Sequence, residues 1–99
     1  MLNIRKELNG DTLVIGLEGR LDTGTAPKLE GEMRPALKGV SSLVFDLDGL
    51  EYISSAGLRV LLTAQKIMNG QGTMVIRNAS EEVMEIFDVT GFSGVLSIE

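Results

Sequence analysis

The feature that most constrains the fold is an apolar run, a helical pattern and a second apolar run between residues 43 and 76. The first run is rich in large apolar residues, as in a strand buried on both faces, and comprises Leu43, Val44, Phe45 and Leu47. Residues 55–69 then space their leucines at helical intervals, and Met74-Val75-Ile76 forms the second run. A strand, a helix and a strand in this order predict a βαβ unit with two parallel strands.

The first residues of the chain predict a β-hairpin ahead of that unit. Apolar side chains alternate with polar ones over residues 2–8, and again at Leu13, Ile15 and Leu17. Between the two segments lies Asn9-Gly10, a pair that tolerates the positive φ angles of a tight hairpin turn. We therefore expect two antiparallel strands here.

A helix is expected between the hairpin and the βαβ unit, over residues 25–38. Leu29, Met33 and Leu37 are four residues apart, and Thr25 is expected to be the N-cap. Pro35 conflicts with a regular helix because proline lacks the amide hydrogen and clashes with the preceding turn. We expect a kink or an early end there.

The last twenty residues predict one more helix and one more strand. Ser80 is expected to cap the helix, and Gly91 and Gly94 flank a turn into a short strand at 95–98. The predicted order is β-β-α-β-α-β-α-β. Residues 1–99 are thus expected to form a single α/β domain, with a mixed sheet of about five strands and helices mostly on one face.

Composition narrows the classes of function. Nine basic and fourteen acidic residues give a net charge of −5, which argues against a broad basic face for nucleic acid or anionic lipid. The chain has no cysteine and no histidine, so a thiolate nucleophile, the commonest general base and the commonest metal ligand are missing. No apolar run approaches the ~20 residues of a membrane span. We expect a cytoplasmic, non-enzymatic protein without metal, cofactor or membrane insertion.

The most informative segment is Ser54-Ser55-Ala56-Gly57-Leu58, between an aspartate-bearing strand and an apolar helix. A helix start exposes unpaired backbone N–H groups and the positive end of the helix dipole, so it accommodates a phosphate. The purely structural interpretation makes Ser54 the N-cap and Ser55 the first helical residue. In that interpretation the next two residues are small because the helix packs closely.

This segment resembles the signature of the STAS domain family, and more narrowly that of the bacterial anti-sigma factor antagonists. A second segment, Gly19-Arg20-Leu21-Asp22, is similar to the family's Gly-x-Leu/Ile-Asp segment. The order of the predicted elements fits the family domain as well. The resemblance therefore covers nearly the whole chain.

The resemblance implies a phosphorylation site at Ser55, which matches the serine that the partner anti-sigma factor phosphorylates in these antagonists. Ser54 occupies the position of the family's usual aspartate and is a second, less favoured phosphoacceptor. Asp22 matches the aspartate of the loop beside the site. The implied partner-binding residues are Asp22, Thr23, Ser54, Ser55, Ala56, Gly57 and Leu58.

The resemblance also implies a partner switch. The unphosphorylated protein would dock on an anti-sigma factor with serine kinase activity, which frees the sigma factor and so affects transcription. Phosphate on Ser55 would weaken that docking, and a phosphatase would reset the cycle. No nucleic acid is expected to bind the chain itself.

Other interpretations stay open. The same fold could serve as the STAS subunit of an ABC transporter for lipids without phosphorylation, or as a module that senses a small molecule or nucleotide. A hydrolase or transferase is least favoured, because no acid–base pair converges. The acidic residues Asp46, Asp48 and Glu51 are interpreted as solvated or capping groups rather than cation ligands. Arg59 is interpreted as solvated surface, with a partner contact as the alternative.

Overall fold

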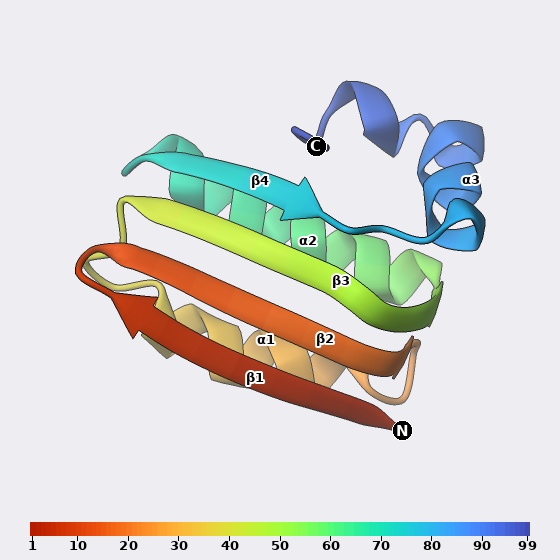
Figure 1. The fold of residues 1–99 in the computed structure, drawn as a ribbon, viewed down its shortest axis with the longest axis horizontal. Coiled ribbons are helices and arrows are strands. Elements are labelled where there is room, and N and C mark those ends of the chain that lie inside the picture. The colour runs from red at the N-terminus through yellow and green to blue at the C-terminus, as the bar shows by residue number, and fades with distance from the viewer.

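The computed structural model describes residues 1–99 and contains one mixed sheet of four strands in the order β1-β2-β3-β4 (Figure 1). The strands are β1 (Leu2–Asn9), β2 (Thr12–Leu21), β3 (Ser42–Ile53) and β4 (Thr73–Arg77). β1 pairs antiparallel with β2, while β2 with β3 and β3 with β4 are parallel. The predicted hairpin and the predicted βαβ unit are both confirmed. The hairpin turn, however, is Gly10-Asp11 rather than Asn9-Gly10, because Asn9 still pairs with Thr12 in the ladder and of these residues only Gly10 has a positive φ, 64°.

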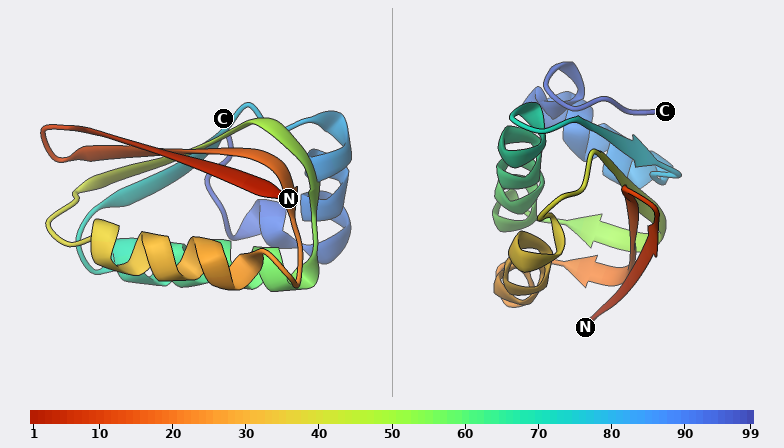
Figure 2. Two further views of the ribbon diagram at one scale, coloured as in Figure 1. Left: turned by 90° about the horizontal axis from the view of Figure 1, so that it is seen from below. Right: turned by 90° about the vertical axis from the view of Figure 1, so that its left-hand side faces the viewer.

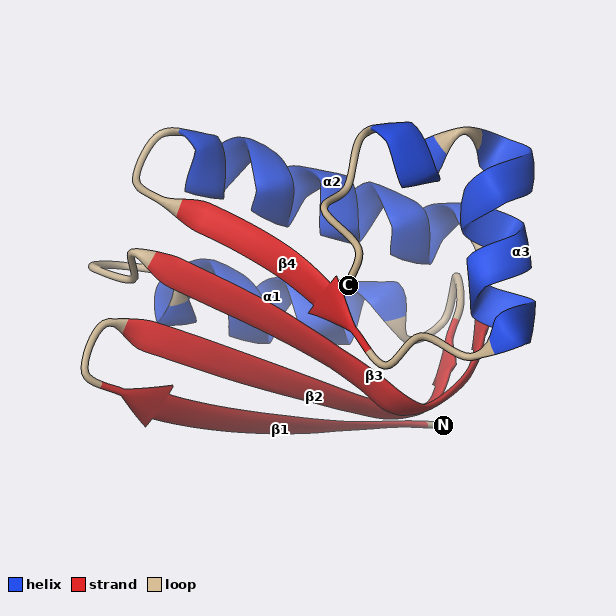
Figure 3. Cartoon of the chain, turned by 45° about the horizontal axis from the view of Figure 1, so that its top comes forward, coloured by secondary structure: helices blue, strands red, loops and turns tan.

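Two helices, α1 (Ala26–Ala36) and α2 (Ser55–Asn69), lie side by side on one face of the sheet (Figure 2). A third helix, α3 (Glu81–Thr90), stands at the end of the sheet toward which the three parallel strands run (Figure 3). A short 3₁₀ helix, η1 (Phe92–Gly94), follows it. None of these helices combines the length and the apolar character that a membrane span requires.

The hydrophobic core fills the space between the sheet and α1 and α2. Alternate residues of β2, among them Ile15 and Leu17, point into it, as the period of two along the strand predicts. Leu29 and Met33 of α1 and Leu61 of α2 meet them from the helix side and are fully buried. One contiguous cluster of 25 buried residues results, and the predicted α/β class is confirmed.

The strand expected at 95–98 is reduced to a single parallel bridge between Ile76 and Ile98. Two backbone hydrogen bonds make this bridge: the Ile76 amide donates to Ser97 O at 2.8 Å, and the Glu99 amide donates to Ile76 O at 2.8 Å. Gly91 takes a left-handed conformation with φ of 80° and leads into η1, which uses residues that a longer strand would need. The sheet therefore has four strands instead of five.

Helix α1 ends at Ala36, one residue after Pro35, and the expected early end is confirmed. At its other end Thr25 occupies the N-cap position, but its side chain makes no capping hydrogen bond. The Thr25 hydroxyl instead donates to Arg20 O at 2.9 Å. Thr25 therefore does not cap the helix as expected. The Asp22 carboxylate accepts hydrogen bonds from the Gly24 and Thr25 amides at this helix start instead.

Candidate functional site

Strand β3 continues past Asp48 and Gly49, beyond the apolar run at 43–47, and ends only at Ile53. The pairing of β2 with β3 shifts register between Gly16 and Glu18 and again at Gly19, as β-bulges do, and the two strands bend strongly at this end (Figure 2). Only Ser54 then separates β3 from α2. The start of α2 therefore lies directly at the end of β3.

Ser54 is the N-cap of α2, as the structural interpretation of the sequence predicts. Its backbone is extended, and its hydroxyl oxygen accepts a hydrogen bond from the Gly57 amide at 3.4 Å. Its own amide donates to Leu21 O at 2.9 Å, which ties the cap to the end of β2. Ser55, the first residue of α2, is exposed. The two adjacent serines therefore differ in that only the Ser54 hydroxyl is engaged in capping.

Gly57 and Leu58 are buried beneath this surface. A Cβ on Gly57 would lie 2.6 Å from Leu21 Cγ and 2.9 Å from Ile53 Cγ1, so only glycine lets the helix approach this closely. Leu58 is 3% exposed. These two predicted partner-binding residues can therefore contribute only by placing the exposed side chains around them.

Asp22 organises the loop between β2 and α1. Its Oδ1 accepts hydrogen bonds from the Gly24 amide at 3.0 Å and the Thr25 amide at 3.1 Å. Its Oδ2 lies 3.9 Å from Arg20 Nε. Desolvation raises the pKa of Asp22, but the hydrogen bonds from Thr25 and Gly24 and the Arg20 charge outweigh it and hold the pKa below its ordinary value. Asp22 is thus a fixed negative charge in the loop next to β2.

One side-chain contact near the site was not predicted from the sequence. The Arg20 guanidinium carbon lies 4.4 Å from the centroid of the Tyr52 ring, a cation–π contact at the ends of β2 and β3. The two residues face each other because the second register shift pairs Arg20 with Tyr52. Gly16 and Gly19, which lie at the two shifts, are a signal for a bulge, but they do not specify which residues the shift pairs.

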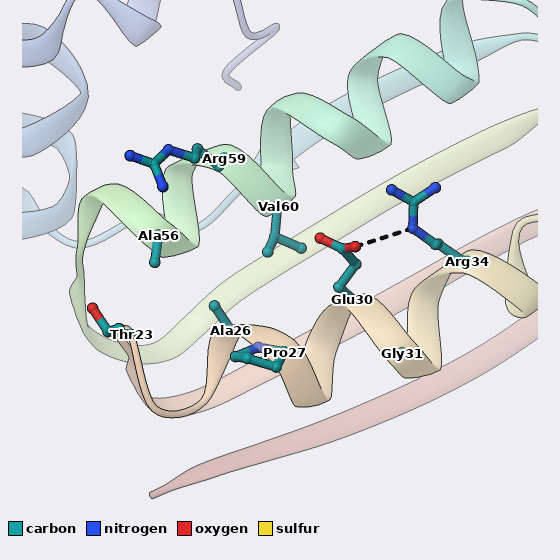
Figure 4. A pocket seen from close by; sticks show the side chains of 9 residues that line it. All are labelled: Thr23, Ala26, Pro27, Glu30, Gly31, Arg34, Ala56, Arg59 and Val60. Carbon is teal, nitrogen blue, oxygen red and sulfur yellow. Dashed lines mark hydrogen bonds and ion pairs between the residues drawn. The ribbon is translucent and has the colours of Figure 1, made fainter.

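A groove of about 450 Å³ runs between α1 and α2 beside the site (Figure 4). Its wall is formed by Thr23, Ala26, Pro27, Glu30, Gly31, Arg34, Ala56, Arg59 and Val60. Thr23 and Ala56, both predicted partner-binding residues, lie at its end. The Arg34 side chain is paired with Glu30, with Nε 3.2 Å from Oε2. The groove could not be predicted because it depends on how the two helices pack.

The acidic residues of β3 do not gather into a cation site. Asp46 Oδ1 accepts hydrogen bonds from Asn78 Nδ2 and from the Asp48 amide, each at 3.1 Å. Desolvation raises the pKa of Asp46, but these hydrogen bonds and the charges of Arg77 and Arg5 outweigh it and hold the pKa below its ordinary value. No group of three or more carboxylates, histidines or cysteines is placed to hold a metal ion.

The sequence model of the STAS domain family matches residues 3–99. The chain belongs to the STAS domain family. BtrV of Bordetella bronchiseptica, named as an anti-sigma factor antagonist, is 38% identical over 88 residues, 87% of this chain and 76% of BtrV. The anti-sigma-B factor antagonist of Bacillus subtilis is 26% identical over 98% of this chain and 90% of its own. The predicted family is confirmed.

Solved structures agree on the fold of this STAS domain. An anti-sigma factor antagonist from Mycobacterium paratuberculosis superposes with a TM-score of 0.90 at 20% identity, over 99% of this chain and 85% of the other. SpoIIAA of Bacillus in the phosphorylated form superposes with a TM-score of 0.76 at 19% identity, over 98% and 91% of the two chains. Membership of this family agrees with the expectation of a regulatory protein rather than an enzyme.

Proposed function

We propose that this STAS domain is a cytoplasmic anti-sigma factor antagonist that is switched by phosphorylation of Ser55. The observation that carries the proposal is the different placement of the two serines. Ser55 is exposed at the first position of α2, whereas the Ser54 hydroxyl is engaged as the helix cap. The similarity to curated antagonists, at 38% identity for BtrV, supports the class of function.

The proposed partner is an anti-sigma factor with serine kinase activity. The unphosphorylated protein docks on it through the exposed or half-buried residues at the end of the sheet, Asp22, Thr23, Ser54, Ser55 and Ala56. Docking frees the sigma factor to bind RNA polymerase. The ATP in such a system belongs to the partner, because this chain has no phosphate-binding loop motif.

Phosphate on Ser55 reverses the docking through charge and bulk. It adds about −1.5 to −2 charges to a chain of net charge −5, beside the loop of Asp22, since the neighbours of Ser55 and Asp22 are joined by the hydrogen bond from the Ser54 amide to Leu21 O. A penalty of about 3–4 kcal/mol corresponds to a several-hundred-fold loss of affinity. A phosphatase that removes the phosphate restores the docking form.

The replacement of the family's usual aspartate by Ser54 keeps the structural role of that position. Serine and aspartate are both strong N-caps, and here the Ser54 oxygen accepts the hydrogen bond from the Gly57 amide. What changes is the charge next to Ser55, since serine is neutral. The backbone that presents Ser55 is therefore formed without the aspartate.

The test is a pull-down from a lysate of the source organism with wild type and with Ser55→Asp, followed by mass spectrometry. We expect wild type to retain an anti-sigma factor of the serine kinase type and Ser55→Asp to lose it. With that partner purified, ATP-dependent phosphorylation is expected to disappear in Ser55→Ala and to persist in Ser54→Ala, which loses about 1 kcal/mol of capping.

Two outcomes would contradict the proposal. Retention of a transporter ATPase or permease by both wild type and Ser55→Asp would assign the chain to a transporter complex instead. Phosphate that persists in Ser55→Ala and is lost in Ser54→Ala would place the switch on the other serine.

A further inference from the structure

We propose that Arg59 forms an ion pair with the phosphate on Ser55 and holds it against the exposed face of α2. This inference rests on the proposed function and adds to it how the phosphorylated state is stabilised. Ser55 and Arg59 are four residues apart in one helix, and both are exposed. Residues with this spacing are neighbours on the helix surface, with Cβ atoms about 6 Å apart.

Arg59 is a cation without an acidic partner. The ion pairs of the structure are Lys6 with Glu32, Arg20 with Asp22 and Arg34 with Glu30, and Arg59 takes part in none of them. Figure 4 shows its side chain extending back toward the start of α2 near Ala56, while Arg34 turns to Glu30. Its guanidinium is therefore free to receive an anion added at the first turn.

The order of the two residues is the favourable one. An anion that precedes a cation by four residues stabilises a helix more than the reverse order, because each charge then lies toward the dipole end that favours it. A phosphoserine offers three strong acceptor oxygens, and a guanidinium presents paired N–H donors that match two of them. The Asp22 carboxylate does not compete for Arg59, since it is engaged with the loop amides and Arg20.

The ion pair fixes the position of the phosphate and changes the charge of the α2 surface that a partner contacts. In the unphosphorylated protein Arg59 is exposed on the wall of the groove between α1 and α2. In the phosphorylated protein the same guanidinium is occupied by the phosphate. Phosphorylation therefore adds a negative group and withdraws a positive one from the same helix turn.

The test is a phosphorus NMR titration of protein carrying phosphoserine at position 55, introduced during translation. We expect the second pKa of the phosphate to rise by about 0.15–0.4 pH units in Arg59→Gln, the size that an exposed helical ion pair gives. Arg59→Lys, which keeps the charge, is expected to show a smaller rise. The matched control is Arg34→Gln, which removes the same charge from the opposite wall of the groove. It is expected to change the phosphate pKa by less than about 0.1 units, about one-tenth of the free energy of a full pKa unit.

An equal shift in Arg34→Gln and Arg59→Gln, or no shift in Arg59→Gln, would overturn the ion pair. Because the phosphoserine is installed directly, this result does not depend on any kinase. A partner that fails to phosphorylate Ser55 would refute the proposed function and leave the NMR result standing. Circular dichroism of each variant verifies that the fold is retained.

Discussion

At the residue scale, the start of α2 shows how neighbouring side chains take different roles. Ser54 and Ser55 have the same chemistry, yet one caps the helix and the other is exposed, because the backbone changes from extended to helical between them. Two residues further on, Gly57 lies against Leu21 and Ile53 and sets how closely the helix packs on the sheet. The geometry around Ser55 therefore depends on a residue that no partner can reach.

We predict that Gly57→Ala lowers the free energy of unfolding by about 1–3 kcal/mol, as overpacking in a dense core does. The added Cβ would lie 2.6 Å from Leu21 Cγ. The measurement is urea unfolding followed by circular dichroism. Gly31→Ala in α1 is the matched control: its Cβ meets no atom within 4 Å, and the gain in helix propensity is expected to stabilise by up to about 1 kcal/mol. Equal stabilisation by both variants would show that Gly57 is not needed for packing.

At the element scale, the end of α1 is completed by a residue from a distant loop. Because α1 ends at Ala36, the carbonyl groups beyond it lie outside the helix and need other donors; Leu37 O accepts from the Val40 amide at 3.2 Å. Gln71, in the turn after α2, donates from Nε2 to Leu37 O at 2.6 Å and to Val40 O at 2.7 Å. One side chain thus joins the α1–β3 and α2–β4 connections.

We predict that Gln71→Met lowers the free energy of unfolding by about 1–3 kcal/mol, because the partly buried Val40 O loses its donor and Leu37 O keeps only the Val40 amide. Urea unfolding measures it. The control is the same substitution at Gln65, whose Nε2 bonds only to the exposed Asn69 and whose Oε1 is buried without a partner. A smaller effect is expected there. Equal losses of unfolding free energy at both positions would mean that the hydrogen bonds from Gln71 to Leu37 O and Val40 O do not contribute to stability.

At the scale of the whole molecule, acid stability depends on two carboxylates at different sites. Asp22 holds the loop before α1, and Asp46 connects β3 to Asn78 after β4. Both have a pKa below the ordinary value of 3.8 in the folded protein. Above that value both are ionised in the folded and the unfolded chain, so their contribution to stability is fully present. As the pH falls below it, the unfolded chain binds protons first and the contribution is lost.

We therefore predict that the stability of wild type declines as the pH falls below 3.8 and through the lowered folded-state values. In the double variant Asp22→Asn, Asp46→Asn this part of the decline is expected to be shallower, since neither side chain titrates. Urea unfolding at pH values from about 7 down to 3 measures the difference in slope. Parallel curves for the two proteins would show that these carboxylates have ordinary pKa values.

The sequence by itself determined the order of the elements, the βαβ unit and the family. Those features depend on local signals: the alternation in β2, the helical spacing of α2, Gly10 at the hairpin and Ser54 at the cap. Each is encoded within a few neighbouring residues, so it can be read along the chain. The helix-start segment that places Ser55 belongs to the same class of signal.

Only the tertiary structure decided how these elements meet. The pairing of β2 with β3 continues past Asp48 and Gly49 through two register shifts, and the second shift places Arg20 over Tyr52. The packing of α1 beside α2 forms the groove that Arg59 lines, and the edge of β4 accepts one bridge at Ile98 in place of a fifth strand. These features depend on contacts between residues far apart in the chain, and no local pattern encodes such contacts.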